Sequence, residues 1–167
     1  MEILIISGIS GAGKSKAASF LEDMGFYIID MMPAEMILKC AEFSSTGVNS
    51  RYDRVALVYD VRTASSNTEL FDVMEKLKAM DASCRMLFLD ATPETVIKRY
   101  KETRRQHPIT ISEKLPITEA IARERRLLQP LRARAQYVID TSLLSTAQNK
   151  ERVCSLFLDH GESPMAL

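Results

Sequence analysis

The sequence has few cysteines, no net charge and no long hydrophobic run. Its three cysteines, Cys40, Cys84 and Cys154, lie far apart and form no C-x-x-C pair, which argues against a disulfide framework and against a zinc site. No apolar stretch reaches the roughly 18 residues of a membrane-spanning helix, and no basic segment precedes the first apolar run. These absences predict a cytoplasmic protein with reduced thiols and no membrane partner.

The balance of charge also limits the class of partner. Lys and Arg number 22, as do Asp and Glu, so the surface as a whole cannot hold a long nucleic acid by charge alone. The charge is uneven, however, because residues 98–134 contain eleven Lys and Arg against four Asp and Glu, a local balance of +7. A basic segment on an acidic remainder favours a site for a compact anion.

The 167 residues have the length and the 46% hydrophobic content of one globular domain. Short apolar runs alternate with longer segments of helical spacing, which predicts an α/β fold with a parallel sheet covered on both faces. The expected strands are 3–6, 26–30, 55–60, 86–90 and 137–140, and the expected helices are 14–24, 34–43, 66–80, 93–102, 117–134 and 145–158. Four of these runs end in Asp, and we expect the four acids to gather around the loop after the first strand.

The first apolar run leads into GISGAGKS, which matches the phosphate-binding pattern G-x-x-x-x-G-K-[ST] in full. Glycines at these places let the backbone curl so that N–H groups and the start of the next helix face a phosphate. In this pattern Lys14 reaches the β- and γ-phosphates and the Ser15 hydroxyl binds Mg²⁺. The alternative is a Gly-rich turn that only caps a helix. The residues expected to bind the nucleotide here are Gly8, Ile9, Ser10, Gly11, Ala12, Gly13, Lys14, Ser15 and Lys16.

A magnesium site also needs a carboxylate, and two apolar runs end in a suitable Asp. Asp60 closes VALVYD, and Arg62 follows it as a cation on the expected substrate side. We expect Asp60 to hold Mg²⁺ through water, the alternative being a solvated acid at a strand end. Asp90 closes MLFLD just before Pro93, where Asp90 or Thr92 more simply caps the next helix.

Asp30 follows the second expected strand and leads into Met31-Met32-Pro33. In a small-molecule kinase, an acid at this place could accept the proton of the substrate hydroxyl. An Asp that orients the turn before Pro33 is an equally good interpretation.

The basic segment KRYKETRRQHP predicts a helix followed by a loop-like stretch up to Pro116. Together with the start of the following helix it forms an expected lid over about residues 99–118. Arg99, Arg104 and Arg105 would neutralise charge on a transferring phosphoryl group, the alternative being a solvated basic helix face. We expect His107 to be a structural residue at a helix end. The run Arg123-Glu124-Arg125-Arg126 mixes both signs and predicts a solvated helix face.

These segments together resemble the RapZ/YvcJ family of bacterial P-loop nucleotide-binding proteins. GISGAGKS, GFYIIDMMP, VALVYDVR, LFLDATPETVIKRYKETRRQHP and YVIDTSLLS carry the resemblance, which runs from about residue 1 to 158. It implies a P-loop NTPase fold, a kinase-like three-layer sandwich with a central five-stranded parallel sheet. It also implies binding and slow hydrolysis of ATP or GTP with Mg²⁺, with Gly8, Gly13, Lys14 and Ser15 on the phosphates and Asp60 in the second motif.

Proteins similar to this one serve as RNase adapters that present a small RNA to a ribonuclease. Family members usually continue into a second domain, so we expect RNA and ribonuclease to bind only through that domain, which is absent here. Residues 1–158 would then be the nucleotide-binding domain and 159–167 a tail at its boundary. The family usually has Asn-Leu-Pro where this chain has Met31-Met32-Pro33, which removes a polar group from the expected acceptor side.

The sequence therefore leaves three functions open. The leading one is a regulatory nucleotide-binding domain with weak ATPase or GTPase activity, compatible with a homo-oligomer. The second is a small-molecule or nucleotide kinase with Asp30 as base and the lid arginines as clamps. The third is a non-catalytic adapter in which the loop acts only as a switch.

Overall fold

The computed structural model describes residues 2–30, 34–45, 54–59, 67–80, 83–103 and 106–158. Several residues singled out in the sequence lie outside these ranges: Met31, Met32, Pro33, Asp60, Arg62, Arg104, Arg105 and the segment 159–167. The roles predicted for them stay predictions.

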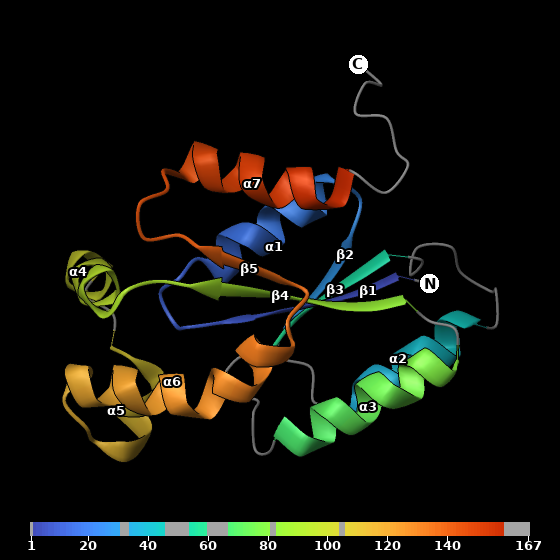
Figure 1. Ribbon diagram of the computed structural model, residues 1–167, viewed down its shortest axis with the longest axis horizontal. Helices are drawn as coiled ribbons and strands as arrows, with labels where there is room; N and C mark the ends of the chain where they lie inside the picture. Colours follow the sequence, from blue (N-terminus) through green and yellow to red (C-terminus); the bar gives the residue numbers. More distant parts are fainter. Residues whose placement is uncertain are drawn as a thin grey trace.

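A parallel five-stranded sheet forms the centre of the molecule (Figure 1). Its strands are β1 (Glu2–Gly8), β2 (Tyr27–Asp30), β3 (Arg54–Val58), β4 (Ser83–Asp90) and β5 (Tyr137–Asp140). They lie in the order β2-β3-β1-β4-β5, so the first strand is the central one. Ile3, Ile5 and Ile6 of β1 are buried on both faces of the sheet, as expected of a continuous apolar run.

Helices cover both faces of the sheet, which confirms the predicted three-layer α/β architecture. Helices α1 (Lys14–Asp23) and α7 (Thr146–Leu158) lie side by side on one face, and α2 (Ala34–Ser45), α3 (Asn67–Ala79) and α6 (Ile117–Arg134) lie on the other (Figure 1). Helix α4 (Pro93–Thr103) lies beyond the carboxyl edge of the sheet. Among the described residues, no helix is both long and apolar enough to cross a membrane.

The predicted loop between His107 and Pro116 is wrong, because a short helix, α5 (Pro108–Glu113), forms there. His107 caps it, since the ring Nδ1 accepts a hydrogen bond from the Ile109 N–H at 3.1 Å. Pro108 occupies the first turn, where its missing N–H costs nothing, and Lys114 ends the helix with a left-handed φ of 57°. The prediction that His107 is a structural residue at a helix end is confirmed.

The order of the strands separates the described acids that end them, Asp30, Asp90 and Asp140. β1 lies between β3 and β4, so of the described acids only Asp90 lies beside the loop that follows β1. Asp30 and Asp140 end the two edge strands, β2 and β5. The expectation that the acids gather around one loop is therefore wrong for Asp30, because β3 intervenes.

Candidate functional site

The loop from Gly8 to Gly13 joins β1 to α1, and its first glycine is required by close packing. Gly8 has a φ of 150°, and a Cβ there would lie 2.3 Å from the Leu89 carbonyl oxygen of the neighbouring strand. Real Cβ atoms do not approach backbone oxygens that closely. The pairing of β1 with β4 thus explains why the pattern begins with glycine.

The other two glycines turn the chain into the helix. Gly11 and Gly13 have left-handed φ values of 88° and 103°, which side-chain-bearing residues rarely adopt. Gly13 is the N-cap of α1, and it has no side chain with which to cap this helix end. An anion placed there would meet the N–H groups of the first turn, and the helix dipole would add a favourable field.

Lys14 follows the loop, and its side chain reaches back to the first residue of the loop. Its Nζ donates a hydrogen bond to the Gly8 carbonyl oxygen at 2.9 Å. Ser15 and Lys16 follow it and are exposed. Among the described residues, Lys16 makes a long contact, 3.4 Å, to the Thr146 hydroxyl at the start of α7.

Arg99 on α4 holds the outer side of the same loop. Its Nη1 donates to the Gly11 carbonyl oxygen at 2.7 Å and to the Thr141 hydroxyl at 3.1 Å, and its Nη2 donates to the Thr141 carbonyl oxygen at 2.8 Å. The Thr141 hydroxyl in turn donates to the Ala12 carbonyl oxygen at 2.7 Å. The sequence predicted that Arg99 lies on the substrate side of the lid and neutralises a transferring phosphoryl group. Here its guanidinium contacts the loop backbone and the residue after β5.

Glu124 holds the inner side of the loop, and this corrects the sequence analysis. The run that contains it was predicted to be a solvated face, yet Glu124 is 0% exposed. Its Oε1 accepts the Ser10 N–H at 2.9 Å, and its Oε2 accepts the Ser10 hydroxyl at 2.5 Å. The spacing of Ala120, Glu124 and Leu128 by four residues could have revealed this burial, because such residues share one helix face.

The prediction of a solvated helix face is also wrong for Arg125. It forms an ion pair with Asp90 at 3.2 Å and donates a hydrogen bond to the Ala91 carbonyl oxygen. Arg132 pairs with the other carboxylate oxygen of Asp90 at 3.2 Å. Asp90 is therefore committed to two arginines, while Thr92 caps α4 by accepting the Thr95 N–H at 3.3 Å.

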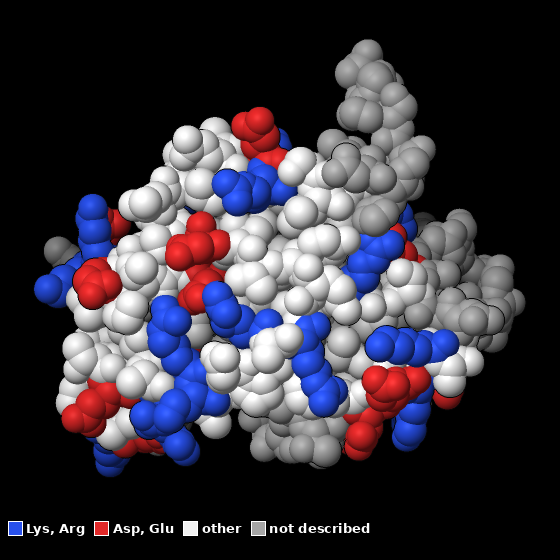
Figure 2. All heavy atoms as spheres, in the orientation of Figure 1, with Lys and Arg blue, Asp and Glu red and all other residues white. Residues whose placement is uncertain are grey.

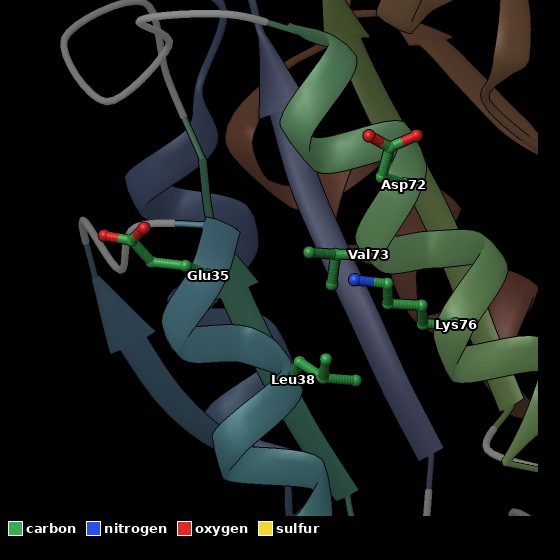
Figure 3. A pocket seen from close by; sticks show the side chains of 5 residues that line it. All are labelled: Glu35, Leu38, Asp72, Val73 and Lys76. Carbon is green, nitrogen blue, oxygen red and sulfur yellow. The ribbon is translucent and has the colours of Figure 1, made fainter.

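A hollow of about 300 Å³ lies elsewhere, between α2 and α3 (Figure 3). Glu35 and Leu38 of α2 face Val73, Asp72 and Lys76 of α3 across it. None of these residues belongs to the loop after β1 or to the elements that hold it. The face of the molecule in Figure 2 carries basic and acidic side chains side by side, in keeping with the zero net charge.

The donor set at the loop fits a magnesium ion that arrives with a phosphate. Among the described residues, no group of three or more His, Cys, Asp or Glu could hold a metal alone. Mg²⁺ does not require such a cage, since it is commonly bound by one or two side chains together with phosphate oxygens and water. The exposed hydroxyl of Ser15, in the first turn of α1, is a suitable ligand of that kind.

The fold agrees with several solved structures. The shikimate kinase from Acinetobacter baumannii in complex with shikimate superposes with a TM-score of 0.62 at 14% identity, covering 95% of this chain and 94% of that one. The Deinococcus radiodurans tunicamycin resistance protein superposes with a TM-score of 0.61 at 18% identity, covering 93% and 94%. At such identities the likeness concerns the fold, which is that of kinase-like P-loop proteins.

Curated relatives share far more sequence. A nucleotide-binding protein from Caldicellulosiruptor bescii is 43% identical over 158 residues, 95% of this chain and 54% of the relative. One from Methylococcus capsulatus is 42% identical over 154 residues, 92% and 52%. The chain thus spans about half the length of the curated relatives it matches. The family described as the RapZ-like N-terminal domain matches residues 1–161, and the chain belongs to that family.

Proposed function

We propose that this chain binds a nucleoside triphosphate, ATP or GTP, together with Mg²⁺ at the loop Gly8–Ser15. The observation that carries the proposal is the N-terminus of α1, which has Gly13 as its N-cap and follows two left-handed glycines, with Lys14 beside it. Such a helix end with a lysine is a site for a polyphosphate. The names of the relatives, nucleotide-binding proteins, support the same conclusion.

Each residue of the loop has a proposed role. The N–H groups of Gly11, Gly13 and Lys16 are proposed to face the phosphates, Lys14 to neutralise their charge, and Ser15 with Asp60 to hold the metal. Gly8, Ile9, Ser10 and Ala12 shape the loop instead, since the N–H groups of Ile9, Ser10 and Ala12 donate to Leu89, Glu124 and Ile9. When bound, Mg²⁺ would bridge phosphate oxygens and offset their negative charge. Arg104 and Arg105 are proposed to face the γ-phosphate from the lid, and Arg99 keeps the loop in place through Gly11.

We further propose slow hydrolysis of the nucleotide in a regulatory role in the cytoplasm. The alternative function is transfer of the γ-phosphate to a small acceptor, with Arg62 and Asp30 on the acceptor side. It is favoured by the kinase-like fold and by the exposed position of Asp30 at the end of β2. Analysis of phosphorylated products with a panel of hydroxyl and phosphate acceptors separates the two, since only a kinase forms ADP or GDP in step with a new phosphoester or phosphoanhydride.

The partners of the longer relatives are also proposals for this chain. We propose that RNA and a ribonuclease bind to the part of such proteins outside the matched residues, because this chain has no net positive charge to attract a long nucleic acid. Assembly into a homo-oligomer is compatible with this arrangement.

Thermal unfolding with Mg²⁺ and each nucleotide tests the proposed binding. A ligand at a hundred times its Kd stabilises a protein by about 2.7 kcal/mol, which raises the Tm of a domain of this size by roughly 5 to 10 °C. We expect such a shift with ATP or GTP and none with the corresponding nucleoside. Equal Tm values with and without every nucleotide would contradict the proposal.

A further inference from the structure

Three hydrogen-bond donors converge on the carboxylate of Glu124. Two come from Ser10 in the loop, its N–H and its hydroxyl, and the third comes from the ring of His107, whose Nε2 lies 3.1 Å from Oε1. Both Glu124 and His107 are inaccessible to water, with 0% and 1% of their surfaces exposed. A buried carboxylate is stable only when its oxygens are satisfied in this way.

The surroundings of His107 decide which ring nitrogen carries the proton. Nδ1 accepts the N–H of Ile109, so it has no proton of its own. The neutral ring therefore carries its proton on Nε2 and donates it to Glu124. The cap of α5 thus orients a donor toward the carboxylate that holds the loop.

This arrangement is not that of a serine nucleophile. In such a site the imidazole lies between the serine and the acid, where it can take the hydroxyl proton. Here the acid, Glu124, lies between Ser10 and His107, so the imidazole hydrogen-bonds to Glu124 and not to the Ser10 hydroxyl. The network therefore fixes the position of the loop at Ser10 and does not activate the Ser10 hydroxyl.

The charge of Glu124 is maintained despite its burial. Burial alone raises the pKa of this carboxyl, but hydrogen bonds from His107 and Ser10 and the nearby charge of Lys14 lower it overall. Glu124 is thus an anion beneath the loop, and Lys14 is the loop residue whose charge it meets.

We propose that Glu124 is a positioning residue for phosphate binding, which fixes the path of the loop at Ser10 and couples it through His107 to helix α5 of the lid. The carboxylate accepts the Ser10 N–H, and this sets the direction in which Gly11 and Gly13 present their N–H groups. Movement of α5 would shift His107 and hence the loop. The inference rests on the proposed nucleotide binding.

A glutamine can replace this carboxylate without losing a contact. Its Oε1 can accept from both the Ser10 N–H and His107, as the carboxylate oxygen does now. Its amide can donate to the Ser10 hydroxyl, which is free to rotate. Glu124→Gln therefore keeps the hydrogen bonds and removes the charge, whereas Glu124→Ala removes both. The exposed Glu119 on the same helix supplies the control, Glu119→Gln.

Calorimetric titration of the full 167-residue chain with Mg·ATP and Mg·GTP tests the proposal, alongside the Tm of each variant without ligand. For the nucleotide that the wild type binds, we expect Glu124→Ala to bind about tenfold more weakly or worse. Glu124→Gln should stay within about threefold of the wild type, and Glu119→Gln should equal it. Loss of stability without loss of affinity in folded Glu124→Ala would overturn the inference, as would equal losses in both Glu124 variants.

A second measurement needs no change at Glu124, which matters if Glu124→Ala does not fold. The chain has only two histidines, so ¹⁵N-histidine spectra with a His160→Gln variant assign His107 directly. We expect a proton on Nε2, and we expect its resonance to shift as Mg·nucleotide saturates the wild type. An unchanged His107 signal at saturation would overturn the coupling. Absence of binding by the wild type would instead contradict the proposed function, and the inference with it.

Discussion

The guanidinium of Arg99 donates a 2.7 Å hydrogen bond to the carbonyl oxygen of Gly11, across 88 residues of sequence. The same side chain makes two further hydrogen bonds to Thr141, which follows β5. One arginine therefore ties the outer side of the loop to the end of an edge strand. Its planar fork of donors makes this possible, because a lysine ammonium cannot match several acceptors in fixed directions.

Arg99→Lys should loosen the loop while leaving the net charge unchanged. We expect weaker Mg·nucleotide binding by about 3- to 10-fold, equivalent to the roughly 0.5 to 1.5 kcal/mol of a hydrogen bond. Titration calorimetry of Arg99→Lys and of Lys98→Arg, a charge-conserving change at the exposed neighbour on α4, measures the effect. If Arg99→Lys bound Mg·nucleotide as tightly as Lys98→Arg and the wild type, Arg99 would not shape the loop.

Gly8→Ala should destabilise the fold severely, because its Cβ would lie 2.3 Å from the Leu89 carbonyl oxygen. The strands must separate to accept it, at a cost of about 3 kcal/mol or more. Gly25→Ala is the matched control, since Gly25 also has a left-handed φ, 98°, but nothing lies within 4 Å of its Cβ position. There we expect a loss of about 1 to 2 kcal/mol in urea unfolding. Similar losses of unfolding free energy in Gly8→Ala and Gly25→Ala would show that the contact of Gly8 with β4 does not determine the cost of the substitution.

The charge of Glu124 should contribute to stability at neutral pH and be lost in acid. Its pKa in the folded protein is lower than the ordinary 4.5, so the contribution is present above pH 4.5 and disappears as the pH falls through the folded value. Glu124→Gln resembles the protonated carboxyl. We expect the wild type to exceed it in Tm at pH 7 and the gap to close below pH 4.5. A gap independent of pH would contradict this.

Cys84 should resist thiol reagents in the folded protein. It is buried at the start of β4, and loss of water around it raises its pKa to about 11, although Lys78 lowers it slightly. Cys40 and Cys154 are only partly buried. At pH 8 we expect a disulfide reagent to label these two before Cys84, with Cys84 labelled only in denaturant. Equal labelling rates for the three thiols would show that this face of the sheet opens readily.

Local patterns in the sequence were sufficient to predict most of the fold. Continuous apolar runs predicted all five strands, because strands buried on both faces need no polar alternation. The G-x-x-x-x-G-K-[ST] pattern predicted the place of the loop between β1 and α1. Its first glycine is explained only by Leu89, which belongs to a strand about 80 residues further along the chain.

The side chains that hold the loop were harder to predict because their partners lie far away in sequence. Glu124 meets Ser10 across 114 residues, and the mixed charges around it resemble an exposed helix face. Arg99 was expected beside a substrate because lid arginines often bind phosphate, yet it contacts loop carbonyls. The order of the strands, which separates Asp30 from the loop, is likewise not encoded in any single run.

The most direct test of the account is the affinity of the wild type and of Lys14→Ala for Mg·ATP and Mg·GTP, measured by titration calorimetry. Lys14 is half-buried at the start of α1 and does not belong to the hydrophobic core, so its loss should leave the far-UV circular dichroism unchanged. We predict that the wild type binds one of the two nucleotides and that folded Lys14→Ala binds it at least about 100-fold more weakly, which corresponds to about 2.7 kcal/mol. Equal affinity of the two proteins, or no binding of either nucleotide by the wild type, would contradict the assignment of the loop as the phosphate site.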